Sequence, residues 1–197
     1  MANTLLSRAA SGIADPALLP LPARVAALLS DLGSPPRLAA HLRAVHDVAH
    51  QLVDWVERHC PALIFDREAV LFGAATHDVG KTVHVAELSG PGSAHEEAGQ
   101  ALLIGHGFSP ELARFAATHA SWADARVGLE DLLVSLADKI WKNKRVPDLE
   151  DLVVAHLARA TGRAPWEEFI ALDGLLALIG DAADERLAFQ ASFPIHG

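Results

Sequence analysis

Apolar residues recur at three- and four-residue spacing along almost the whole of this 197-residue chain. That spacing is the period of an α-helix, and no convincing run of alternating apolar and polar residues, as in a half-buried strand, interrupts it. The sequence Ser34-Pro35-Pro36 indicates an N-cap followed by proline at the first helical position, which opens a helix extending to about His59. The pattern predicts an all-α fold.

Capping residues, prolines and glycines mark the other predicted helices. Asp66 is expected to cap a helix that runs toward His77, and Ser93 is expected to start one through the S-x-x-E capping box. Ser109, followed by proline, opens a helix carrying His119. Further helices are predicted at residues 129–143, 147–160 and 165–189, and a loop at 83–92.

No repeat and no long linker divides the chain, so we expect a single-domain helical bundle. Residues 1–33 are predicted to form an N-terminal helical extension, residues 34–145 the core, and residues 146–197 C-terminal helices that pack on the core. The last two helices carry no convergent reactive groups. We interpret them as packing elements or as the interface of a homodimer.

Composition excludes several classes of protein. The formal net charge of −9 argues against general nucleic-acid binding, which needs a basic face. One cysteine, Cys60, excludes an internal disulfide. The longest uncharged stretch, residues 98–110, is too short to span a membrane, and the N-terminus lacks the pattern of a signal peptide. We therefore expect a cytoplasmic protein with no membrane association.

Eleven histidines accompany that single cysteine, and two of them compete on the helix predicted at 36–59. His41 falls within the apolar stripe of this helix, formed by Leu38, Val45, Val48, Leu52 and Val56. His46 falls with polar residues that we expect to face solvent, namely His50, Asp54 and Glu57. A histidine on a core face is often only a satisfied core residue. We favour His41 over His46 as a metal ligand.

The most informative segment is Thr76-His77-Asp78-Val79-Gly80-Lys81. An imidazole and a carboxylate from one short stretch of backbone suit zinc, manganese or iron. The alternative is a helix end with two solvated polar residues, but this pair ends an apolar helix, where unpaired polar groups are costly. Lys81 stands within reach of an anion bound at the same place.

Three more ligand-type residues are predicted at inward positions of later helices: His95, His119 and Asp138. A buried Asp138 requires a metal or a salt bridge. Lys139 is expected to point too far around the helix to be its partner. Two other histidines of this interval, His84 and His106, fall in predicted loops.

The order His41 … His77-Asp78 … Asp138 resembles the HD superfamily of metal-dependent phosphohydrolases. The stretch 77–81 is similar to that family's HDxGK pattern, 136–139 resembles the motif with its final aspartate, and the resemblance covers residues 38–142. With His95 and His119 the order becomes H…HD…H…H…D, similar to a bacterial diadenosine tetraphosphatase group. The resemblance implies an HD-type bundle whose metal ligands are His41, His77, Asp78, His95, His119 and Asp138.

By the same resemblance, Asp78 would bridge two divalent ions, drawn from Fe, Mn, Zn, Ni and Mg. Such ions lower the pKa of a shared water from about 15.7 to about 7. The implied reaction is attack by that metal-bound hydroxide on a phosphoester or phosphoanhydride of a small phosphorylated substrate, expected to be a nucleotide. Asp78 would orient the nucleophile, and Lys81 would neutralise the developing charge.

Two other functions fit the same residues: a di-iron oxygenase of HD type and a non-catalytic nucleotide-binding regulatory module. Arg43 is either a further phosphate contact or an exposed arginine. The basic run formed by Lys139, Lys142, Lys144 and Arg145 is either a solvated helix end, where cations offset the helix dipole, or a rim for substrate phosphates.

Overall fold

The computed structural model describes residues 2–124 and 127–195, and within these ranges it contains helices and no strand. The all-α prediction is confirmed. From the N-terminus, the described chain forms the α-helices α1 (Ala2–Ser11), α2 (Ala23–Asp31), α3 (Pro36–His59), α4 (Arg67–Thr76) and α5 (Ala94–Gly105). They are followed by α6 (Pro110–Ala113), α7 (Phe115–Thr118), α8 (Leu129–Ile140), α9 (Pro147–Thr161), α10 (Pro165–Asp181) and α11 (Ala183–Ala191). Two short 3-10 helices, η1 (Val79–Thr82) and η2 (Val85–Leu88), join α4 to α5.

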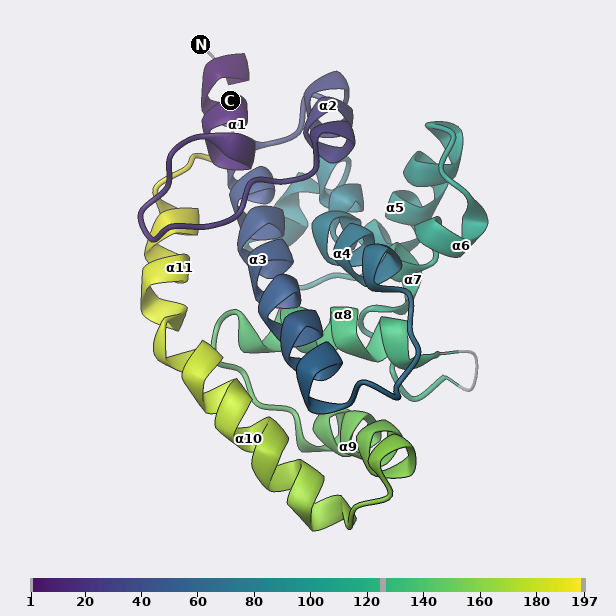
Figure 1. The fold of residues 1–197 in the computed structure, drawn as a ribbon. Coiled ribbons are helices and arrows are strands. Elements are labelled where there is room, and N and C mark those ends of the chain that lie inside the picture. The colour runs from purple at the N-terminus through teal and green to yellow at the C-terminus, as the bar shows by residue number, and fades with distance from the viewer. Residues whose placement is uncertain (1, 125–126, 196–197) are drawn as a thin grey trace.

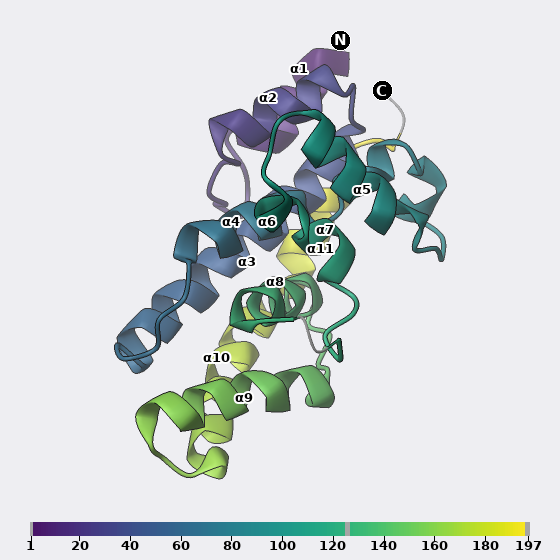
Figure 2. The same cartoon turned by 90° about the vertical axis from the view of Figure 1, so that its right-hand side faces the viewer.

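The long helix α3 organises the packing (Figure 1), because α1, α4, α8 and α11 all contact it. Its predicted apolar stripe is buried, with every member at most 1% exposed: Leu38, Val45, Val48, Leu52 and Val56. Seen from the side in Figure 2, α9 and α10 lie at the opposite end of the molecule from α1 and α2. The helices that supply the candidate ligands lie between these two ends.

Local capping chemistry accounts for several helix starts. The carboxylate of Asp66 accepts a hydrogen bond from the Ala69 N–H at 3.0 Å, and the Ser109 hydroxyl accepts one from the Leu112 N–H at 3.4 Å, as predicted. Two predicted helices are interrupted instead. The segment after Ser109 forms α6 and α7 rather than one helix, and the helix expected at 165–189 is divided between α10 and α11.

The capping box expected at the start of α5 does not form, because the Ser93 side chain makes no capping hydrogen bond. Glu87 takes its place. This residue belongs to η2, within the stretch expected to be an irregular loop, and its carboxylate accepts the N–H groups of Ala94 and His95 at 3.2 Å each. The segment between α4 and α5 is therefore tied to the first turn of α5.

A glycine lets η1 approach α5 closely. A Cβ atom on Gly80 would lie 1.9 Å from the carbonyl oxygen of His95 and 2.6 Å from the nitrogen of Gly99. Any side chain here would require the backbone to move. The backbone that follows the His77-Asp78 pair is thus pressed directly against α5.

Arg43 is buried, at 2% exposed, which contradicts both expectations for it. Its guanidinium donates to the carbonyl oxygens of Leu18, Gly12 and Leu19 at 2.6, 2.8 and 3.0 Å. Five donors in a planar group can satisfy several carbonyls of an irregular segment at once. Arg43 therefore ties the segment between α1 and α2 to α3 and has no role with phosphate.

A buried acid joins the C-terminal helices to α3. Glu168 of α10 is fully buried, and its carboxylate accepts hydrogen bonds from His59 at 2.5 Å and from the Thr161 hydroxyl at 2.8 Å. These contacts explain how α9 and α10 pack on the rest of the chain. The use of these helices as a homodimer interface remains a prediction. Among the described residues, no helix combines the length and apolar character needed to cross a bilayer.

Candidate metal centre

All six predicted ligands meet in one buried cluster, although they come from five parts of the fold. His41 lies on α3, His77 and Asp78 follow α4 directly, and His95 lies in the first turn of α5. His119 follows α7, and Asp138 lies near the end of α8. None of the six is more than 7% exposed. The helices bring together residues that are up to 97 positions apart.

One half of the cluster contains His41, His77 and Asp138, whose ligand-type atoms lie within 4.8 Å of one another. The Nε2 atoms of His41 and His77 are 3.3 Å apart. The Oδ1 atom of Asp138 lies 3.4 Å from Nε2 of His77 and 3.8 Å from Nε2 of His41. Three donor atoms thus converge on a space the size of a single ion.

The other half contains Asp78, His95 and His119, and its ligand-type atoms also lie within 4.8 Å of one another. The Oδ1 atom of Asp78 is 3.0 Å from Nε2 of His95 and 3.5 Å from Nε2 of His119. This group could hold a second ion.

The carboxylate of Asp78 connects the two halves. While its Oδ1 atom faces the imidazoles of His95 and His119, its Oδ2 atom lies 3.1 Å from Nε2 of His41 and 3.6 Å from Nε2 of His77. One carboxylate therefore offers a different oxygen to each pair of histidines. That is the arrangement required of a ligand that bridges two ions.

Hydrogen bonds at the far side of three imidazoles fix their orientation. Nδ1 of His77 donates to the Ala74 carbonyl at 2.9 Å, and Nδ1 of His119 donates to the Ala116 carbonyl at 3.1 Å. A carbonyl oxygen can only accept, so Nδ1 of each ring carries a proton and Nε2 faces the cluster, the orientation in which it can bind a metal. Nδ1 of His95 contacts Oε2 of Glu87 at 2.5 Å, which orients that ring in the same way.

Burial and the shared carboxylates set the charge states. Burial lowers the pKa of His41, and it lowers the pKa of His119 to about 4. Burial also opposes the charged form of Asp78, but the surrounding imidazoles outweigh it and hold that carboxyl's pKa well below its usual value. Neutral imidazole and ionised carboxylate are the forms that coordinate metals. His41 and His119 are therefore neutral near neutral pH and Asp78 is ionised, as metal binding requires. Burial also disfavours the charged form of His95, but the neighbouring carboxylates of Asp78 and Glu87 outweigh it and raise the pKa of this ring.

Two buried atoms of the cluster support the fit to a metal. Oδ1 of Asp78 and Nε2 of His95 lie 3.0 Å apart without the geometry of a hydrogen bond, and neither atom has another hydrogen-bond partner within residues 2–124 and 127–195. A buried polar atom without a partner costs about 1–3 kcal/mol, more if it is charged. A cation between them would satisfy both atoms, and a set of imidazole nitrogens and carboxylate oxygens suits zinc, iron or manganese.

Two lysines flank the carboxylates. Nζ of Lys81 lies 2.6 Å from Oδ2 of Asp78, and Nζ of Lys139 lies 2.5 Å from Oδ2 of Asp138. The expectation that Lys139 points away from Asp138 was wrong, because its long, flexible side chain folds back along α8 to reach the neighbouring carboxylate. Both cations border the cluster.

The rest of the basic run behaves differently. Arg145 forms ion pairs with Glu150 and Asp173, at 2.7 Å in each case, so it serves the packing of α9 and α10. Lys142 and Lys144 are exposed. Of this run, Lys139 alone contacts a residue of the cluster through a recorded hydrogen bond or ion pair.

Two further features were mispredicted or missed. His46 was expected to face solvent, but it is only 4% exposed. It lies in the wall of a cavity whose other walls come from the segment leading into α2 and from α4, and helical periodicity within 36–59 carries no information about those segments. Glu87 was not singled out, because an acidic residue in a glycine- and proline-rich stretch gives no periodic signal. A carboxylate eight residues before a candidate histidine ligand was the one available hint.

Comparisons with known proteins add no assignment: the chain matches no protein-family model, no curated protein and no solved structure.

Proposed function

We propose that this chain is a metal-dependent phosphohydrolase of the HD type, which cleaves a phosphoester or phosphoanhydride of a nucleotide or similar phosphorylated metabolite. The observation that carries the proposal is the position of Asp78, whose two oxygens each face a separate pair of buried imidazoles. A single carboxylate shared in this way favours a pair of ions over one. Paired ions are widely used to cleave phosphate esters.

His41, His77 and Asp138 would hold one divalent ion, His95 and His119 the other, and Asp78 would contact both. Bound divalent ions supply acidification of a water and polarisation of phosphoryl oxygens. The Nδ1 hydrogen bonds of His77, His95 and His119 keep three Nε2 lone pairs aimed inward, so these ligands need no reorientation to bind.

Lys81 and Lys139 provide positive charge at the edge of the cluster. Their ammonium groups already lie against Asp78 and Asp138, so either could contact a phosphoryl oxygen with a small change of rotamer. The overall charge of −9 does not oppose this role, because bound cations and nearby lysines dominate the local potential. The Asp78 carboxylate would additionally accept a hydrogen bond from the attacking water and orient it.

The test combines metal analysis with substrate turnover. Purified protein is loaded separately with Fe²⁺, Mn²⁺, Zn²⁺, Ni²⁺ or Mg²⁺, its metal content is measured by mass spectrometry, and phosphate or nucleotide release is followed over mononucleotides, dinucleoside polyphosphates and cyclic nucleotides. We expect two ions per chain and release from at least one substrate class. His95→Ala and His119→Ala should each lower the metal content to about one ion and abolish turnover.

His106→Ala is the matched control. This histidine lies between His95 and His119 in the sequence, but its side chain is exposed and its Nδ1 donates to the Leu102 carbonyl. It should bind two ions and turn over substrate normally. Full activity with one ion, retained after removal of His95 and His119, would contradict the paired-ion model. Oxygen consumption by the iron form, without release from any phosphorylated compound, would contradict the hydrolase.

A further inference from the structure

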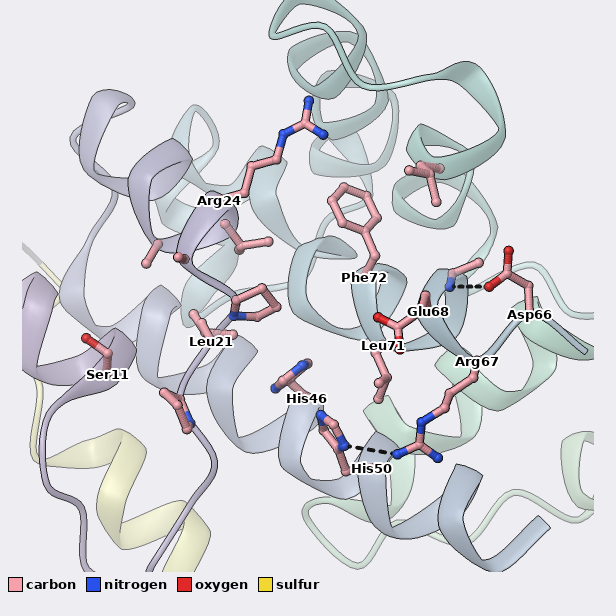
Figure 3. Close-up of a pocket in the computed structure, with 17 residues that line it drawn as sticks. Ser11, Leu21, Arg24, His46, His50, Asp66, Arg67, Glu68, Leu71 and Phe72 are labelled. Atoms are coloured by element: carbon pink, nitrogen blue, oxygen red, sulfur yellow. Dashed lines mark hydrogen bonds between the residues drawn. The ribbon is translucent and has the colours of Figure 1, made fainter. Parts of the chain in front are cut away.

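A cavity of about 1160 Å³ opens between the segment leading into α2, helix α3 and helix α4 (Figure 3). Ligand pockets commonly have volumes of roughly 300–1,000 Å³, so this space accommodates a molecule of several rings. Its walls are mainly aliphatic and aromatic, and they include Leu21, Leu71 and Phe72. A cavity of this size and character is suited to a largely apolar ligand.

This cavity is separate from the metal centre. Its α3 residues are His46 and His50, whereas the ligand that α3 contributes to the centre is His41. At about 100° per residue, five positions place His46 about 140° around the helix from His41. None of the six candidate ligands lines the cavity. The two sites therefore use different faces of one helix.

His46 marks the polar point of the cavity wall. It lies between Leu21 and Leu71 in Figure 3, it is 4% exposed, and its Nδ1 has no hydrogen-bond partner among the described residues. Burial lowers its pKa to about 3, so the ring is neutral and can offer one N–H donor and one acceptor. An imidazole left in this state at a cavity wall indicates a ligand with a complementary hydrogen-bonding group.

His50 adds a second hydrogen-bonding position beside it. The ring centroids of His46 and His50 are 4.7 Å apart, and Nη2 of Arg67 lies 3.5 Å from Nδ1 of His50. A guanidinium can only donate, so Nδ1 of the neutral ring accepts and Nε2 carries the proton. Next to His46, His50 therefore presents an N–H donor that suits a carbonyl or hydroxyl oxygen.

Charge complementarity argues against a charged ligand. The lining holds two arginines and two acidic residues, Arg24, Arg67, Asp66 and Glu68, whose formal charges cancel. Arg67 is already paired with Asp54 and Glu57 at 2.7 and 2.8 Å. The guanidinium of Arg24 lies over the ring of Phe108, with 4.0 Å between its Cζ and the ring centroid, and points away from the cavity in Figure 3. Neither arginine is placed to neutralise an anion deep inside.

We propose that this cavity binds an uncharged, mainly apolar ring compound that carries a hydroxyl or carbonyl group, and that His46 and His50 hydrogen-bond to that group. The site is independent of the proposed hydrolase activity. It rests on the shape of the cavity and its polar groups, and it stands whether or not the metal centre is catalytic.

Three probes of matched size test the ligand class: 1-naphthol, naphthalene and 1-naphthoate, titrated into the full chain by calorimetry. We expect 1-naphthol to bind at one site. Naphthalene should bind about 5- to 10-fold more weakly, because it lacks the hydrogen bond, whose net value is about 1 kcal/mol. The anionic naphthoate should bind weakest. Strongest binding by naphthoate, or equal binding by naphthol and naphthalene, would overturn the assignment.

Three variants test the location of the site and the role of its polar group. Ala26 lines the cavity, whereas its neighbour Ala27 is exposed and does not. Ala26→Trp should therefore weaken naphthol binding at least tenfold, and Ala27→Trp should leave it unchanged. His46→Phe keeps an aromatic ring and should remove the preference for naphthol over naphthalene. Thermal unfolding checks that each variant is folded. Undiminished binding by a folded Ala26→Trp chain, or no binding of any probe by the wild type, would overturn the proposal.

Discussion

His41 and His46 lie five residues apart on α3, and both are buried, at 6% and 4% exposed. On the face of His41, two carboxylates, Asp78 and Asp138, lie 3.1 and 3.8 Å from its Nε2 atom. On the face of His46, the neighbouring ring is that of another histidine, His50. Arg67 contacts Nδ1 of His50 and is itself paired with Asp54. Burial of an imidazole therefore does not identify a metal ligand.

What distinguishes the two faces is the supply of negative charge. A divalent cation loses its hydration shell on binding in a buried site, and ionised carboxylates compensate for that loss far better than neutral imidazoles do. The same helix can thus hold a candidate metal centre on one side and an apolar cavity on the other. Three predictions test this contrast.

The largest effect is expected from the shared carboxylate. Asp78→Asn keeps the shape of the side chain but removes the negative charge between the two histidine pairs, so both ions should be lost after dialysis, as measured by mass spectrometry. His46→Asn, on the opposite face of α3, should retain both. Retention of either ion at wild-type affinity by Asp78→Asn would show that the shared carboxylate is not needed for binding and would break the comparison.

A smaller effect is expected from Glu87, which orients His95 through a 2.5 Å contact. Outer-shell partners of metal ligands typically contribute 10- to 100-fold in affinity. Glu87→Gln should weaken one of the two ions by about that factor and leave the other unchanged in a metal titration. Glu97→Gln, an exposed residue of the same helix turn, serves as the control and should change neither. Equal weakening of both ions would assign Glu87 a general structural role.

The smallest effect concerns acid stability. Burial lowers the pKa of His46 to about 3 in the folded chain, against 6.5 for an ordinary histidine, so between these values the unfolded chain binds the extra proton and stability falls as pH falls. From pH 7 to pH 5 this residue should account for about 2 kcal/mol of lost stability.

His46→Leu should remove that part of the acid dependence, and His106→Leu, at an exposed position, should not. Urea unfolding of the metal-free chain at pH 7 and pH 5 measures the difference. An identical loss of stability in wild type and His46→Leu would mean that the ring is hydrated in the folded state. The side of α3 that carries His46 would then be in contact with water, and the contrast between the two faces of α3 would weaken.

The sequence predicted what depends on neighbours along the chain. The inward position of His41 followed from a stripe of five apolar residues on its own helix, and the Asp66 cap followed from one side chain and the helix that begins after it. The choice of six ligands relied on a resemblance in their order, and the structure shows that these residues converge.

Features that depend on distant segments were not predictable. His46 is buried, in a cavity whose other walls come from outside its helix, at Leu21 and Leu71 among others. Arg43 is buried because three carbonyls of an irregular segment more than twenty positions earlier surround its guanidinium. Lys139 reaches Asp138 through its own rotamer, which a helical wheel does not represent. In each case the deciding contact is absent from the local pattern.

The close crossing at Gly80 has a consequence for how finely the centre can be adjusted. A Cβ on Gly99 would in turn lie 3.1 Å from the nitrogen of Gly80, so main chain meets main chain at this crossing with no side chain between them. The separation between the segment that follows Asp78 and the helix that bears His95 is therefore set by the thickness of two polypeptide backbones. The two backbones are already in contact, so the separation cannot be shortened, and a side chain at Gly80 could only lengthen it.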